Sequence, residues 1–163
     1  MSISLGASLF SISAWALSCT DRRQQLVANL ANFGYDPLNF TWLKDAQVVP
    51  IFLGILSTPN ESLLLKRFAA AGICNLTLAP GIVPHLIECG APALLLPCLS
   101  SSDTHTVLSA LTALFYFSQL GQHAAVSVAT SLVMPLKESQ DSRIRNLAVI
   151  LLQEIAASSF TST

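Results

Sequence analysis

The sequence predicts an all-α fold in which about three helical repeats stack side by side as a solenoid. Its 163 residues are 52% hydrophobic and only 10% charged, so the helices must be buried on several sides. An apolar i, i+4, i+7 pattern, which marks the buried face of a helix, recurs four times with small residues around it. No segment shows the sustained apolar–polar alternation of a β-strand.

The spacing of the repeated pattern indicates the kind of solenoid. Its four copies are Leu26/Leu30/Phe33, Ala69/Ile73/Leu76, Ala110/Leu114/Phe117 and Ala148/Leu152/Ile155. Successive copies begin 43, 41 and 38 residues apart (26 to 69, 69 to 110, 110 to 148). Armadillo and HEAT repeats have this period and place two or three helices in each unit. The spacing therefore predicts an α-solenoid of about three armadillo-type or HEAT-type repeats.

Each repeated helix is expected to have a distinct start and a preceding apolar helix. The apolar runs cover 48–56, 91–99 and 131–136, and the late Pro135 predicts that the third is short or distorted. Thr58, Pro59 and Glu61 read as N-cap, N1 and N3 of the second repeated helix. Residues 100–103 and 141–142 read as caps of the later two. Shorter helices are expected after Asp36–Pro37 and over 82–89.

The chain divides into an N-terminal apolar segment (1–23), an armadillo-repeat domain (24–157) and a flexible tail (158–163). Leu5, Leu9, Ile12 and Ala16 fall on one helical stripe, which predicts a capping N-terminal helix. The same run also resembles the apolar core of a secretory signal, although no Lys or Arg precedes it. The capping interpretation is favoured and the signal stays as an alternative.

Composition and motifs exclude several function classes. The longest uncharged stretch, 104–136, carries polar residues throughout, so a membrane span is not predicted. The net charge of −1 argues against a protein that binds nucleic acid by itself. No zinc-protease helix motif, phosphate-binding glycine loop or nucleophile elbow is present, and the four cysteines show no C-x-x-C spacing. We predict no catalysis, cofactor, metal or small-molecule substrate.

Binding through the repeated helices is the predicted activity. Asn32, Asn75, Tyr116 and Glu154 follow the first apolar position of each copy by six residues. In peptide-binding armadillo proteins asparagines at this place hydrogen-bond an extended ligand; the alternative is that they bond neighbouring helix ends. Tryptophan is missing one turn earlier, which disfavours a receptor for basic cargo. The basic groups 66–67 and 143–145 serve either solubility or an acidic or RNA-adjacent partner.

Four stretches carry a family resemblance: 26–39, 68–76, 106–114 and 143–148. They resemble the armadillo repeat-containing protein 7 family in order, from Gln24 to Ile155, which is 132 of the 163 residues. Tyr35–Asp36–Pro37 and Arg143–Ile–Arg–Asn146 are the more specific matches. Residues 1–20 do not match the more charged start of the family. The stretch 63–67 is about two residues longer than its family counterpart.

The resemblance implies a non-catalytic nuclear adaptor of the minor spliceosome. Such an adaptor binds a small RNA-recognition-motif protein and reaches small nuclear RNA mainly through that partner. A cytoplasmic armadillo scaffold that binds peptides is the alternative, and a secreted or anchored helical-repeat protein is a further one. The candidate partner-binding residues are Asn32, Tyr35, Asp36, Asn39, Asn75, Tyr116, Arg143, Arg145 and Asn146.

Overall fold

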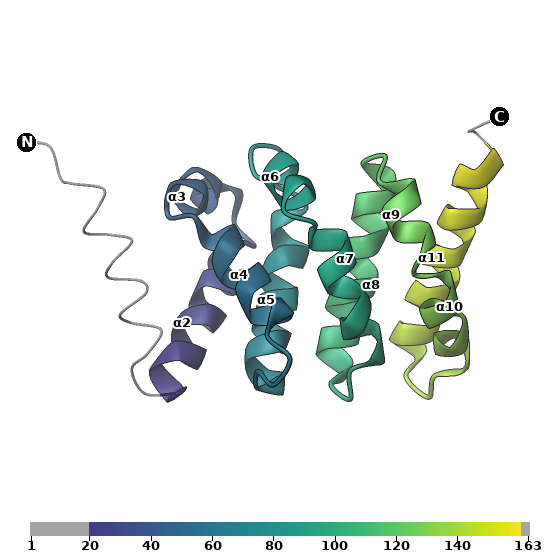
Figure 1. Ribbon diagram of the computed structural model, residues 1–163, viewed down its shortest axis with the longest axis horizontal. Coiled ribbons are helices and arrows are strands. Elements are labelled where there is room, and N and C mark those ends of the chain that lie inside the picture. Colours follow the sequence, from purple (N-terminus) through teal and green to yellow (C-terminus); the bar gives the residue numbers. More distant parts are fainter. Residues whose placement is uncertain (1–19, 161–163) are drawn as a thin grey trace, which may run out of the picture.

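A computed structural model describes residues 20–160, which form a solenoid without a β-strand in that range (Figure 1). Four long helices carry the four copies of the repeated pattern: α2 (Thr20–Phe33), α5 (Leu63–Leu76), α8 (Thr104–Gln119) and α11 (Ser142–Phe160). Each contacts the next in chain order, so they form one row. The periodicity alone had predicted these helices, and the structure confirms them.

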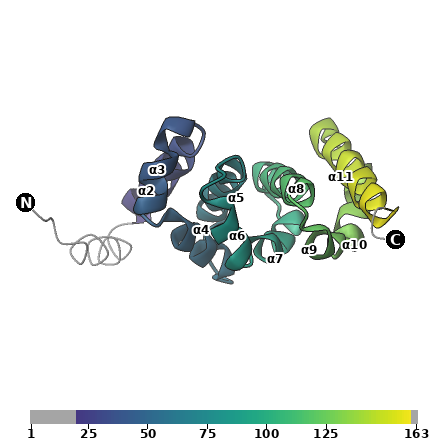
Figure 2. The same cartoon turned by 90° about the horizontal axis from the view of Figure 1, so that it is seen from above.

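A second layer of shorter helices packs behind this row, as the view in Figure 2 shows. It contains α4 (Val48–Ser57), α7 (Ala91–Leu95) continued by η2 (Leu96–Ser100), and α10 (Thr130–Val133) continued by η3 (Met134–Glu138). Each unit opens with short connecting helices, which are η1 (Pro37–Asn39) with α3 (Phe40–Asp45), α6 (Val83–Glu88) and α9 (His123–Ser127). Three three-helix units therefore follow α2.

One hydrophobic core runs through the described solenoid and accounts for the unusual composition. The inner copies of the pattern are closed off from solvent, with Ala110, Leu114 and Phe117 fully buried. In the first copy, by contrast, Phe33 is half-exposed. A helix inside the row is covered by both neighbouring repeats, whereas α2 has a described neighbour on one side only.

The helix starts are as predicted in three places and different in one. Asp103 caps α8 by accepting the Thr106 amide at 2.7 Å, and Asp141 accepts the Arg143 amide at 2.8 Å at the start of α11. Asp36 caps η1. The prediction that Thr58 caps α5 is wrong: Thr58 ends α4, and its hydroxyl donates to the Gly54 carbonyl at 2.8 Å.

The true N-cap of α5 is Ser62, whose hydroxyl accepts the Leu65 amide at 3.2 Å. The four-residue shift frees Glu61 from the helix start and lets it pair with α2. Pro135 has the expected effect, because the third second-layer helix is short and continues as a 3₁₀ turn. Gly90, at φ 73°, makes the turn between α6 and α7 in the left-handed conformation that glycine adopts without strain.

The ends of the described chain differ slightly from the expected boundaries. Helix α2 begins at Thr20, ahead of residue 24, and α11 continues to Phe160, inside the stretch expected to be a tail. The predicted capping helix lies outside the described residues. Within the described residues, no helix is long and apolar enough to cross a bilayer.

Substitution of Gly72 by alanine is expected to destabilise the protein by about 1–3 kcal/mol, the usual cost of overpacking. A Cβ at Gly72 would lie 2.5 Å from Cζ of Phe52, and Phe52 is fully buried and cannot move aside. The midpoint of urea unfolding measures the change.

Gly54→Ala is the matched control, because Gly54 also lies within a helix but its added Cβ would meet nothing within 4 Å. Alanine there should stabilise the protein by up to about 1 kcal/mol, since it restricts the unfolded chain. Equal effects of the two substitutions would contradict the close α4–α5 contact.

Candidate protein-interaction surface

The position six residues after the first apolar residue of each copy lies on the long helices, but the side chains there make different contacts. Asn75 Nδ2 donates to the Ala31 carbonyl of α2 at 2.9 Å, so it ties two long helices together. Gly34 lies against this contact, since a Cβ there would be 3.4 Å from Cβ of Asn75. Asn32, at the equivalent place in α2, is exposed, and Tyr116 is half-buried with its ring edge against Phe115. For Asn75 the structure therefore shows the alternative reading, a bond to a neighbouring helix end.

The other candidates of the first repeat surround the turn after α2. Asp36 accepts the Leu38 amide at 3.0 Å, and Asn39 Nδ2 donates to the Phe33 carbonyl at 3.1 Å. Both side chains hold the turn that carries the chain from α2 into α3. Tyr35 directly precedes Asp36 in this turn and is 82% exposed.

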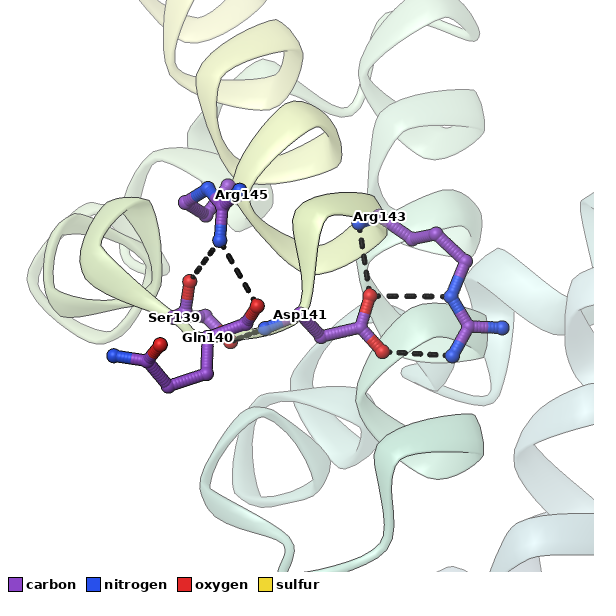
Figure 3. A network of polar contacts seen from close by, with 5 residues as sticks. All are labelled: Ser139, Gln140, Asp141, Arg143 and Arg145. Atoms are coloured by element: carbon purple, nitrogen blue, oxygen red, sulfur yellow. Dashed lines mark hydrogen bonds and ion pairs between the residues drawn. The ribbon is translucent and has the colours of Figure 1, made fainter.

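The basic candidates lie at the start of α11 and bond to their own loop (Figure 3). Arg143 donates from Nε and Nη2 to both carboxylate oxygens of Asp141, at 3.1 and 2.7 Å. These bonds lower the pKa of Asp141 to about 2. Arg145 Nη1 donates to the carbonyls of Ser139 and Gln140 at 2.6 and 3.0 Å. Both arginines fasten the loop before α11, while Asn146 is exposed.

The nine candidate residues do not form one site. Asn32, Tyr35, Asp36, Asn39 and Asn75, the first-repeat group, lie where α2 and α5 end. Arg143, Arg145 and Asn146 lie where α11 begins, at the opposite end of the solenoid (Figure 1). Five of them hold backbone or a neighbouring side chain through the bonds described above. Their binding of a partner remains a prediction, and Asn32, Tyr35 and Asn146 are the exposed members free of such a described role.

An exposed apolar rim beside the first-repeat group was not predicted. It consists of Phe33, Tyr35, Leu38 and Trp42. Leu38 is 89% exposed, and the Phe33 and Trp42 rings meet edge to face with centroids 6.0 Å apart. Large apolar side chains gathered at a surface mark interaction sites more often than scattered ones do. The sequence indicated this rim only by the large apolar residues that occur in and around the turn capped by Asp36.

Ion pairs fasten neighbouring long helices at their N-terminal edge. Arg23 of α2 pairs with Glu61, which precedes α5, at 2.6 Å, and Arg67 of α5 lies 4.0 Å from Asp103, the cap of α8. Burial raises the pKa of Asp103, but bonds from the Thr106 hydroxyl and amide and the charge of Arg67 outweigh it. The pKa of Asp103 therefore lies below its ordinary value.

The long helices hold most of the positive charge of a nearly neutral chain. Six of the eight Lys and Arg residues lie on them: Arg22, Arg23, Lys66, Arg67, Arg143 and Arg145. Only two of the nine acidic residues do so, Asp21 and Glu154. The row thus carries +4 (six minus two) and the rest of the chain −5, which sums to −1. Three of these arginines are paired with carboxylates that directly precede the long helices, Arg23 with Glu61, Arg67 with Asp103 and Arg143 with Asp141, so the excess does not make a basic face.

The groups capable of chemistry are dispersed over the described chain. Cys89 Sγ lies 3.7 Å from His85 Nδ1, a pair that the spacing had not indicated, on the exposed end of α6. Burial raises the pKa of the Cys74 and Cys98 thiols to about 11, which makes them poor nucleophiles. Among the residues that the structure describes, no three His, Cys, Asp or Glu side chains are placed to hold a metal.

Asn75→Ala should lower the free energy of unfolding by about 1 kcal/mol, because the Ala31 carbonyl loses its side-chain donor. Asn32→Ala, at the equivalent exposed position, should stay within about 0.5 kcal/mol of the parent protein. Urea unfolding of both variants measures the difference. Similar values for the two would mean that the bond to α2 contributes nothing.

Asp103→Asn should be less stable than the parent at neutral pH, although Asn retains the ability to cap α8. Because the folded-state pKa of Asp103 is lowered, its charge stabilises the fold above the unfolded-state pKa and ceases to do so as the pH falls through the folded-state value. The stability gap between the two proteins should therefore close as the pH falls from above the unfolded-state pKa, 3.8, through the lower folded-state pKa. Urea titrations across that range test this, and a gap independent of pH would contradict the ionic contribution.

Known proteins share this architecture. No family model matches the chain. A computationally designed armadillo repeat protein for modular peptide recognition superposes with a TM-score of 0.76 at 20% identity, over 93% of this chain and 66% of that one. A designed armadillo repeat protein in complex with the peptide (KR)4 gives 0.76 at 16% identity, over 92% and 64%. The predicted armadillo-type α-solenoid is thereby confirmed.

One curated relative identifies the family. Armadillo repeat-containing protein 7 of Mus musculus is 40% identical over 144 residues, which span 85% of this chain and 71% of the mouse protein. Proteins of this family and fold are typically scaffolds without catalytic activity. The chain belongs to the armadillo repeat-containing protein 7 family.

Proposed function

We propose that this protein is a nuclear adaptor of the minor spliceosome that binds a small RNA-recognition-motif protein. Its armadillo scaffold and family membership support a role in protein interaction. The choice of partner rests on the family resemblance of the stretches 26–39 and 143–148. RNA contact falls mainly to the partner, in keeping with a chain of net charge −1.

The choice of binding surface is supported by the exposed apolar rim, which consists of Phe33, Tyr35, Leu38 and Trp42. Three of these four side chains, Phe33, Tyr35 and Trp42, are aromatic and about half-exposed or more, and aromatic residues are among those that contribute most to protein interfaces. The cap Asp36, between Tyr35 and Leu38 in the sequence, supplies a polar group at the border of the rim. A folded partner can thus bury an apolar centre inside a polar border.

A tagged full-length chain, captured from a nuclear extract at mild salt, tests the proposal. Mass spectrometry should identify an RNA-recognition-motif protein, and sequencing of the bound RNA should identify a minor-spliceosome small nuclear RNA. Depleting the partner protein from the extract should remove the RNA as well. Recovery of neither molecule would refute the spliceosomal role.

Tyr35→Ser with Leu38→Ser should reduce recovery of the partner by about tenfold or more, as loss of interface hot spots does. Both side chains point to solvent, so the helical circular dichroism should be unchanged. Val128→Ser is the control, because Val128 is 63% exposed but follows α9 in the last repeat. Equal recovery by both variants would exclude the rim as the binding surface.

A peptide-binding scaffold in the cytoplasm is the second candidate, since the designed proteins of this fold recognise peptides. One observation weighs against the usual mode: the Asn75 amide is bonded to the Ala31 carbonyl of α2. If the partner were a peptide bound through the asparagines of the long helices, Asn32→Ala with Asn75→Ala would abolish its capture. Binding at the rim would survive this double substitution. The two candidates therefore differ in which double variant loses the partner.

A further inference from the structure

An apolar groove of about 380 Å³ lies between α2, the end of α3 and α4. Its lining consists of Leu26 and Leu30 of α2, Trp42, Asp45 and Ala46 at the end of α3, and Val48 and Ile51 of α4. Five of these seven side chains are large and apolar, and Asp45 is the charged one among them. A groove of this composition is suited to bury an apolar helix.

The position of the groove matches the place of a second-layer helix. In the following repeat, α4 packs on the long helix α5 of its own unit and on α7 of the next unit. A second-layer helix belonging to α2 would, by the same geometry, pack on Leu26 and Leu30 and against Val48 and Ile51 of α4. The groove therefore lies where the repeat geometry places the second helix of the first repeat.

We propose that residues 5–16 of this chain form that helix and fill the groove. In the three described units, the second-layer segments span 48–57, 91–100 and 130–138 and end five, three and three residues before the next long helix. The same lengths counted back from Thr20 place a helix of nine or ten residues within 5–16. The segment of the chain that precedes α2 thus has the length and the position required.

The composition of the segment fits the lining. Residues 1–20 contain no charged side chain, and Leu5, Leu9, Ile12 and Ala16 share one helical stripe. On a helix that stripe provides the apolar face toward the groove, and the small residues Ala7 and Ala14 fall on the opposite side. This proposal does not depend on the identity of the spliceosomal partner.

The outer stripe of α2 indicates that the row of long helices ends there. Arg22, Gln25, Asn29 and Asn32 are all exposed, and Gln25 Nε2 donates to Asn29 Oδ1 at 3.0 Å. A polar stripe of this kind closes a solenoid against further stacking. The apolar surface that is left belongs to the outer layer, so one helix completes the repeat and a further long helix is not required.

Trp42 is the reporter for the test, because it lines the groove and the chain has only one other tryptophan, Trp15. Trp15→Phe in the full-length chain leaves Trp42 as the single fluorophore. If residues 5–16 occupy the groove, Trp42 emission should be blue-shifted, and acrylamide should quench it several-fold more slowly than after Leu9→Asp with Ile12→Asp in the same background.

Ala7→Asp with Ala14→Asp is the matched control, since both residues lie within 5–16 on the side opposite the stripe; it adds the same two charges and should leave Trp42 shielded. Equal quenching in all three proteins would overturn the proposal. Shielding that disappears on dilution, together with a dimer in sedimentation, would also overturn it, because the groove would then hold the segment of a second copy. Shielding in a monomer that only the Leu9 and Ile12 substitutions remove supports it.

Discussion

Close packing of the four long helices is the constraint on which the rest of this structure depends. The helices approach one another through small side chains, since Ala69, Ala70, Ala110, Ala113 and Ala148 are all fully buried between elements. Gly72 brings α4 onto α5 in the same way, with the Phe52 ring filling the space of a side chain. Small residues at these positions set the distance between repeats, and the leucines and phenylalanines around them supply the apolar area that stabilises the row.

Polar side chains then fix how one repeat is placed on the next. At one edge of the row the pairs Arg23–Glu61 and Arg67–Asp103 join successive units, and near the other edge the Asn75 amide joins α5 to the end of α2. Partly exposed ion pairs contribute little to stability by themselves, whereas the caps and the amide bond satisfy backbone groups at helix ends. Two ion pairs and one amide bond therefore mark the junctions between successive long helices.

The first repeat combines several features that bear on function. It carries the apolar rim, the exposed Asn32 and the groove between α2 and α4, while the last repeat presents the Arg143–Asp141 contact at the opposite edge. An adaptor needs one surface for assembly of its own fold and another for its partner. In this family member the groove and the rim share Trp42, so the proposed filling of the groove and the proposed binding of a partner involve adjacent surfaces at one end of the solenoid.

The sequence by itself determined the repeat period, the four long helices, the break at Pro135 and the cap Asp103, because each depends on local periodicity or on a residue with one preferred backbone role. It also located Asn32 and Asn75 at equivalent positions. Only the tertiary structure decided that Asn75 bonds Ala31, that Ser62 replaces Thr58 as a cap, and that the rings of Phe33 and Trp42 meet beside the exposed Tyr35 and Leu38. The Asn75 bond joins residues 44 positions apart, whose distance no local pattern encodes, and the choice of Ser62 left Glu61 free to pair with Arg23 of α2.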